Sequence, residues 1–113
     1  MYLGADISRS QDITRAAAAG QTVLLLCRLP DTTSAIWRYR HESERHHITH
    51  KGVITSKFAD RFQLDAEGLL IKNVQTTDEG TYTCADHHHR HRRRFRLFVP
   101  CELTSYYLLY SDS

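Results

Sequence analysis

Short segments in which apolar and polar residues alternate constrain the fold of this chain more than any other feature. Alternation places the apolar side chains on one face of a strand, because successive side chains point to opposite sides. Four segments show it most clearly, namely residues 21–29, 34–40, 61–65 and 94–99. Turn residues separate these and further β-rich segments every ~8–12 residues. Seven or more short strands with this spacing predict an all-β sandwich.

Length and composition agree with one globular domain. The chain has 113 residues, of which 41% are hydrophobic and 25% charged. It can therefore bury a core and does not fall into the disordered class. No apolar run approaches the ~20 residues that a membrane-spanning helix needs, and no signal peptide is visible after Met1. We therefore expect no membrane insertion within this segment.

Some segments permit more than one structure. The stretch from residue 6 to residue 19 reads as a split edge strand, although the alanines at 16–19 would also suit a helix. Residues 41–45 are expected to form a polar loop, and residues 46–50 a short strand. These alternatives concern the edges of the fold and not its class.

Positive charge is concentrated in one segment. The net charge is only +2, but residues 87–96 read HHHRHRRRFR and contain five arginines and four of the eight histidines. No acidic residue interrupts this segment. A basic segment on a nearly neutral domain indicates an anionic partner.

The cysteine count limits the disulfides that can form. Three cysteines stand at positions 27, 84 and 101. An odd count permits at most one internal bridge and leaves one thiol over. The count alone does not say which two cysteines pair.

A set of spaced residues connects these observations to a known family. Trp37 follows Cys27 by ten residues, and the second half of the chain carries Arg61-Phe62, then Leu69, Ile71 and Val74, then Asp78, Gly80, Tyr82 and Cys84. Over residues 5–100 the chain resembles an immunoglobulin V-like domain, of the V-set or I-set type. It is similar to non-rearranging immune-type receptors and adhesion molecules. The resemblance implies a two-sheet immunoglobulin-like sandwich with Greek-key topology at residues 1–100, followed by a tail or the start of a stem at 101–113.

The resemblance also implies structural roles for individual residues. Cys27 and Cys84 are expected to form the disulfide between the sheets, with Trp37 packed on it. Tyr82 matches the tyrosine corner, and Arg61 and Asp78 match an ion pair at the bottom of the sandwich. All of these residues belong to the scaffold, and none is expected to bind a partner.

Two further features refine the expected type of domain. The spacing of 24 positions from Trp37 to Arg61 leaves room for a C′ strand and a short C″ strand. Antigen-receptor variable domains carry an F-G-x-G bulge in the last strand, whereas this chain has Arg-Arg-Arg-Phe-Arg at 92–96. The missing bulge argues against pairing in the manner of antibody heavy and light chains.

Strand parity predicts which side chains lie on the outer face of the GFCC′ sheet. If Trp37, Tyr82 and Phe95 point inward, their neighbours point outward. The predicted binding residues are Arg38, Arg40, His87, Arg94, Arg96 and Phe98, with Thr83 and Ala85 between them and His46, His47 and His50 alongside. Arginine suits carboxylate, sulfate or phosphate, because its planar fork bonds two oxygens at once, and Phe98 would serve as an apolar anchor. The expected function is extracellular recognition of an acidic protein or an acidic glycan, at the cell surface or in secreted form.

Several other interpretations remain open at this point. The basic run could be a solvated loop of a structural module in a multi-domain chain. The domain could form a homophilic V-domain dimer, although two basic faces repel each other. Protonation of the histidines could make binding dependent on pH. Cys101 could form an interchain disulfide, pair with a cysteine of a further domain or stem, or remain an unpaired thiol.

Other classes of function are not expected. Histidines at 87, 89 and 91 share a face, but the flanking arginines repel a cation, so no metal site is predicted. No catalytic motif appears, which predicts neither an enzyme nor a cofactor. Nucleic acid is disfavoured, because a disulfide-bearing sandwich belongs in an oxidising compartment.

Overall fold

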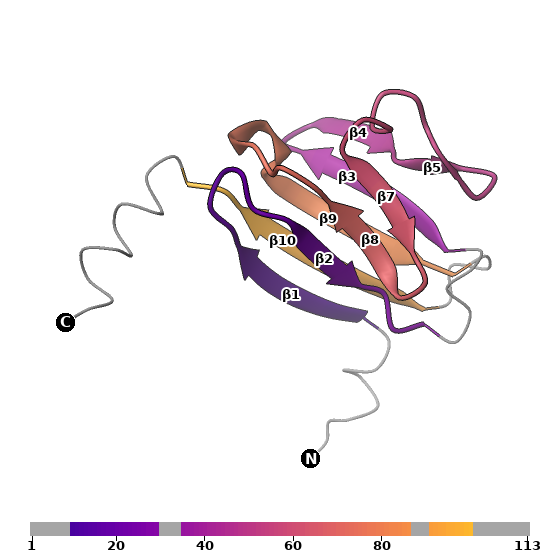
Figure 1. The fold of residues 1–113 in the computed structure, drawn as a ribbon. Coiled ribbons are helices and arrows are strands. Elements are labelled where there is room, and N and C mark those ends of the chain that lie inside the picture. The colour runs from indigo at the N-terminus through magenta and orange to yellow at the C-terminus, as the bar shows by residue number, and fades with distance from the viewer. Residues whose placement is uncertain (1–9, 30–34, 87–90, 101–113) are drawn as a thin grey trace, which may run out of the picture.

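The strands of the protein form two facing layers (Figure 1). The structure, a computed structural model, describes residues 10–29, 35–86 and 91–100. The larger sheet has the order β1 (Ser10–Ala16), β10 (Arg92–Phe98), β9 (Gly80–Ala85), β3 (Ile36–His41) and β4 (Glu44–His47). The smaller sheet has the order β2 (Val23–Leu26), β8 (Gly68–Ile71) and β7 (Phe62–Asp65). A separate hairpin pairs β5 (Thr49–His50) with β6 (Val53–Ile54).

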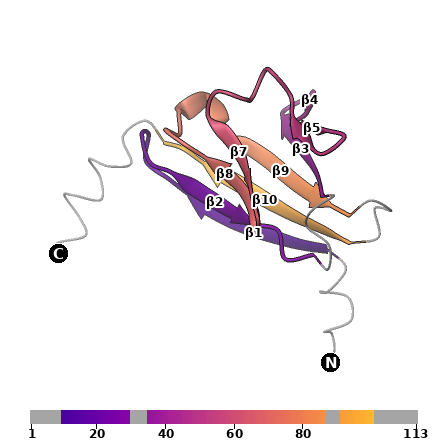
Figure 2. The same ribbon diagram turned by 45° about the vertical axis from the view of Figure 1, so that its right-hand side comes forward.

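The chain passes repeatedly from one layer to the other. It runs from β2 in the smaller sheet to β3 and β4 in the larger one, returns for β7 and β8, and crosses back for β9 and β10. Strand β1 lies parallel to β10, and the other strand pairs of the described residues are antiparallel. Figure 2 shows the same arrangement turned by 45° about the vertical axis. The predicted all-β, two-sheet sandwich is confirmed.

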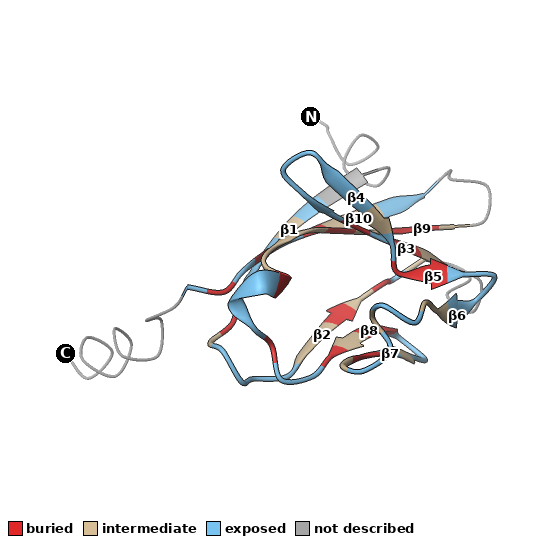
Figure 3. Ribbon diagram, turned by 90° about the horizontal axis from the view of Figure 1, so that it is seen from above, coloured by how far each residue is buried: buried red, intermediate tan, exposed pale blue. Residues whose placement is uncertain are grey.

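The core lies between the layers, and its side chains come from alternate positions of the strands (Figure 3). Trp37 is 1% exposed and stacks on Phe95, with 5.9 Å between ring centroids. The other large and fully buried side chains are Leu25, Ile48, Leu69, Ile71, Val74, Tyr82 and Leu97. The inward faces predicted from alternation are therefore those that the structure buries.

A disulfide between Cys27 and Cys84 joins the two layers, with 6.1 Å between the Cα atoms. Cys27 follows β2, and Cys84 lies on β9 opposite Trp37. Both cysteines are at most 1% exposed. The two cysteines are separated by 57 positions in the sequence. In the chain-entropy model, a disulfide that closes a loop of this length stabilises the fold by about 4 kcal/mol.

The predicted loop at 41–45 is wrong. Strand β3 continues to His41 and β4 begins at Glu44, so only two residues connect them. A turn this tight needs a left-handed residue, and Glu42 provides it with φ of 57°. The polar composition of 41–45 suggested a loop because β4 is an exposed edge strand, where charged residues are common.

Two other local expectations also need correction. The strand expected at 46–50 is two strands, β4 and β5, separated by Ile48, which is fully buried and donates its N–H to the Trp37 carbonyl at 3.0 Å. The alanines at 16–19 do not form a helix. Ala16 ends β1, and Gly20 turns the chain with φ of +94°. Four alanines before such a turn are too few to nucleate a helix.

Candidate functional site

The outward side of the five-stranded sheet gathers arginines that lie far apart in the sequence. We call this surface the basic face. By strand register, it consists of Asp12, Thr14, Ile36, Arg38, Arg40, Arg45, His47, Thr81, Thr83, Ala85, Arg92, Arg94, Arg96 and Phe98. Six arginines and one aspartate therefore lie on it, and none of the described lysines does. The structure thus provides a strongly cationic surface on a chain whose net charge is only +2.

Strand pairing arranges these side chains in rows across the sheet. In one row, Arg38 on β3 lies opposite Thr83 on β9, and Thr83 lies opposite Arg94 on β10. In the next row, the corresponding residues are Arg40, Thr81 and Arg96. Each row therefore has an arginine on either side of a threonine.

Strand β4 and strand β1 complete the two rows at the edges of the sheet. On β4, His47 lies opposite Arg38, and Arg45 lies opposite Arg40. On β1, Asp12 lies opposite Arg94, and its carboxylate oxygen is 3.4 Å from the Arg94 Nε. Asp12 is the one acidic side chain that the described part of the sheet contributes to this face.

A shallow hollow of about 440 Å³ occupies the middle of the basic face. Ile36 and Ala85 contribute apolar surface at one end, and Thr81 and Thr83 contribute hydroxyl groups along it. Ala85 points outward as predicted, yet it is only 4% exposed, because it lies between Ile36 and the long side chain of Arg92. The remaining lining consists of Arg38, Tyr39, Arg40, Arg45, His46, His47, Arg92 and Arg94.

The predicted binding residues are only partly brought together. Arg38, Arg40, Arg94 and Arg96 share the basic face, with Arg94 half-buried and the others exposed. Phe98 is 46% exposed, but it lies beyond the last residue of β10 that pairs with β9, at the margin of the face. His87 lies outside the described residues.

Two of the histidines expected on this face lie elsewhere. His46 points to the opposite side of β4, where it stacks on Tyr39 with 6.1 Å between centroids. His50 belongs to the separate β5–β6 hairpin. Only His47 of the three lies on the basic face, because alternation along β4 sends neighbours to opposite sides.

Sequence reasoning missed Arg45 and Arg92. Arg45 was assigned to a loop, and only the two-residue turn between β3 and β4 places it opposite Arg40. Arg92 has the same parity as Arg94 and Arg96, so the alternation could have identified it. It was missed because the last strand was expected to begin at residue 94, whereas β10 begins at Arg92.

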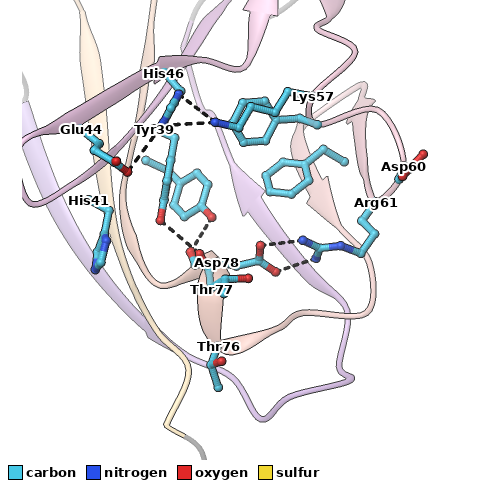
Figure 4. Close-up of a pocket in the computed structure, with 13 residues that line it drawn as sticks. Tyr39, His41, Glu44, His46, Lys57, Asp60, Arg61, Thr76, Thr77 and Asp78 are labelled. Atoms are coloured by element: carbon cyan, nitrogen blue, oxygen red, sulfur yellow. Dashed lines mark hydrogen bonds and ion pairs between the residues drawn. The ribbon is translucent and has the colours of Figure 1, made fainter.

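A second hollow, of about 520 Å³, lies at the end of the sandwich around the predicted ion pair (Figure 4). Arg61 donates two hydrogen bonds to the carboxylate of Asp78, at 2.6 and 2.8 Å. The Tyr82 hydroxyl donates to the Asp78 carbonyl at 2.6 Å, and the Tyr39 hydroxyl donates to the Glu79 carbonyl at 2.6 Å. These groups bond to one another, so they hold strand ends together and are not free to bind a ligand.

Hydrogen bonding to Asp78 and burial shift the pKa values of the groups at this end of the sandwich. The hydrogen bond to Asp78 raises the pKa of Arg61. Burial raises the pKa of Tyr82 far above its usual value, and the charge of Asp78 raises it further. Burial also raises the pKa of Tyr39, again with a contribution from Asp78. Both phenols therefore stay protonated and donate their hydrogen bonds over the physiological range.

Arg93 differs from its neighbours because it points toward the inside of the sandwich. It lies opposite Cys84 on β9, and its Nε is buried without a hydrogen-bond partner. Burial lowers the pKa of Arg93, and the nearby charges of Arg28 and Arg15 lower it further. This guanidinium lies off the basic face, and its unpaired Nε is expected to destabilise the fold.

No group of three or more histidine, cysteine or acidic side chains suited to a metal ion occurs among the described residues. The spacing of His87, His89 and His91 would suit metal ligands, and of these three histidines only His91 lies within the described residues. Within the same part of the chain, no helix is long and apolar enough to cross a membrane.

The model of the immunoglobulin V-set domain family matches residues 11–100. No curated protein matches the chain.

Proposed function

The chain belongs to the immunoglobulin V-set family, and from this premise we propose that it is an extracellular recognition module whose basic face binds an acidic partner. Domains of this family are in general non-catalytic modules that mediate protein interactions and recognition. A V-set domain with a disulfide between its sheets fits an extracellular location, because such bonds persist in oxidising compartments.

The observation that carries the proposal is the charge of the basic face. Six arginines lie on this face and five of them line its hollow, while Asp12 is the one carboxylate that the described strands place beside them. Like charges held this close raise the electrostatic potential of a surface and attract anions. If the charges served only solubility, they would be scattered and mixed with acids.

The homophilic alternative receives less support from this arrangement. Two copies meeting through the basic face would bring twelve arginines together with two aspartates. Like charges placed opposite one another at an interface cost several kcal/mol. A heterologous acidic partner removes this repulsion.

Nuclear magnetic resonance can locate the surface that binds anions. The ¹⁵N-labelled domain would be titrated with oligo-glutamate and, separately, with a heparin-derived hexasaccharide. We expect at least one probe to shift the amides of β3, β9 and β10 more than those of β2, β7 and β8. If neither probe does so, the proposed function is wrong.

Association kinetics provide a second test. Replacing Arg94 and Arg96 together by alanine should slow association with an immobilised anionic probe and flatten its dependence on salt, because clustered surface charges speed the encounter with an anion. The control is the pair Lys51→Ala and Lys72→Ala, which removes two exposed charges that lie off the basic face. Equal effects of both pairs would mean that net charge, and not this face, attracts the probe.

A further inference from the structure

The centre of the basic face is charged, which limits the kinds of partner that fit it. Its two middle rows contain only arginine, threonine and histidine, apart from Asp12. The apolar residues lie at the ends, with Ile36 and Ala85 at one and Phe98 at the other. Protein interfaces show the opposite pattern, because charged residues are depleted at their centres and aromatic anchors are concentrated there.

The strand order turns the arginines into two parallel lines. Arg38 and Arg40 lie along β3, while Arg92, Arg94 and Arg96 lie along β10. Strand β9 runs between them and presents short side chains, so the surface is lower there. We call this feature, the hollow along β9 with its two arginine lines, the arginine trough.

Sheet geometry sets the dimensions of the arginine trough. Neighbouring strands lie about 4.8 Å apart, so the backbones that carry the two lines are about 10 Å apart. Alternate residues along a strand are about 7 Å apart, which is the spacing of arginines within a line. A single extended chain fits between the lines, and it must carry repeated anionic groups on both sides to contact both.

We infer that the arginine trough binds a linear sulfated glycan, whose chain runs along β9. This inference rests on the proposed function and narrows its partner to one class. A sulfated sugar chain carries anions at short intervals on both sides, and its hydroxyl groups can bond to Thr81 and Thr83. Arginine suits sulfate, because its planar fork bonds two oxygens at once and it is more weakly hydrated than lysine.

Single-stranded nucleic acid also carries anionic groups at regular intervals, but the arginine trough lacks exposed aromatic side chains on which bases could stack. Proteins that bind single strands stack the bases on aromatic side chains. The two rows contain no phenylalanine, tyrosine or tryptophan. Tyr39 also lines the hollow, but it is only 9% exposed and its ring packs on Tyr82, so it offers no open stacking surface. Phe98 lies at the margin of the face. A glycan needs no such stacking platform.

Isothermal titration calorimetry at about 0.15 M salt would compare four probes on the whole chain. The probes are a heparin-derived hexasaccharide, a hyaluronan hexasaccharide with carboxylates only, oligo-glutamate, and single-stranded oligothymidine. We expect the heparin hexasaccharide to bind at least about tenfold more tightly than each of the others, since bidentate sulfate contacts add to the attraction that all polyanions share.

The other outcomes separate this inference from the proposed function. If oligo-glutamate binds the basic face as tightly as the heparin hexasaccharide, the glycan inference is wrong and the proposed function stands. Equal binding of oligothymidine would show attraction of any polyanion and would also overturn the inference. If no probe binds in calorimetry and none shifts the amides of the basic face in the NMR titration, both the glycan inference and the proposed function are wrong.

Paired substitutions test the position of the glycan. Arg40→Ala with Arg96→Ala removes one arginine from each line within a single row. We expect Kd for the heparin hexasaccharide to rise about tenfold or more, and the slope of log Kd against log salt to fall by about 2. The control pair Lys51→Ala and Lys72→Ala should change Kd less than about twofold, because both lysines are exposed and lie off the basic face, where salt weakens their attraction to a bound anion. An equal loss in the control pair would contradict a defined site.

A substitution that increases affinity is a further test of the trough, because a misfolded variant would not bind more tightly. Asp12→Asn removes the carboxylate that pairs with Arg94 at 3.4 Å, so Arg94 becomes free to contact sulfate. We expect Kd to fall about two- to threefold, in keeping with the small energy of an exposed ion pair. The control is Glu67→Gln, an exposed acid in the turn between β7 and β8. Unchanged or weaker binding of Asp12→Asn would contradict a role for Arg94.

Discussion

The hydroxyl group of Tyr82 shows how one buried polar atom can stabilise this sandwich. Its ring is 1% exposed, and its hydroxyl donates to the Asp78 carbonyl at 2.6 Å. The same aspartate accepts both hydrogen bonds from Arg61 through its side chain. The residues before β9 are therefore held from two sides, and a buried phenol obtains the partner that it needs.

Replacing Tyr82 by phenylalanine should lower the free energy of unfolding by about 1–2 kcal/mol at pH 7, because a buried hydrogen bond is lost. It should also reduce alkaline sensitivity. Burial raises the pKa of Tyr82 in the folded state, so the wild type loses stability as pH rises above the pKa of about 10 that tyrosine has when unfolded. Urea unfolding at neutral and at alkaline pH checks both effects. An identical alkaline loss in the two proteins would contradict this linkage.

Replacing Arg93 should raise the free energy of unfolding, whereas replacing Tyr82 should lower it. The reason is that the buried Nε of Arg93 has no hydrogen-bond partner. Arg93→Met keeps a long side chain and removes the unpaired donor and its charge. We expect the free energy of unfolding to rise by about 1 kcal/mol, the low end of the cost of an unsatisfied buried group. Arg92→Met is the matched control, since Arg92 is the exposed neighbour. A loss of stability in Arg93→Met, measured by urea unfolding, would show that this guanidinium stabilises the fold.

At the scale of elements, alternation was sufficient to identify most strands and their inward faces. Residues 94–99 were expected to bury Phe95, Leu97 and Val99, and all three are at most 2% exposed. The errors lie at strand ends and turns, such as the two-residue turn at Glu42. Turn geometry depends on which strands pair, and local composition does not contain that information.

The pairing of β2 with β8 requires a glycine at position 68. A Cβ at Gly68 would overlap the backbone oxygen of Leu25. Gly68→Ala should therefore lower the free energy of unfolding by about 2–3 kcal/mol, since the strands must separate to admit it. Glu67→Ala, one residue earlier and exposed, should cost less than about 0.5 kcal/mol. Denaturant unfolding of both variants gives the comparison, and equal costs would contradict the close contact.

At the scale of the whole molecule, charge decides how copies of the chain meet. The basic face is the largest concentration of like charge that the described strands present. Because it repels a second copy, we expect the protein to be monomeric in light scattering when reductant is present. A dimer that persists in reductant would contradict this prediction and favour homophilic packing. A dimer seen only without reductant would be assigned to Cys101, which lies outside the described residues.

The sequence by itself determined the fold class, the inward faces of the strands and, through its family resemblance, the scaffold residues. These properties depend on local alternation and on motifs with defined spacing, and both can be read along the chain. Only the tertiary structure decided that Arg38, Arg40 and Arg45 lie across β9 from Arg92, Arg94 and Arg96. Parity tells which side of a strand a residue occupies, but strand order and register decide which residues share a surface. The arginine trough exists because β9 lies between β3 and β10.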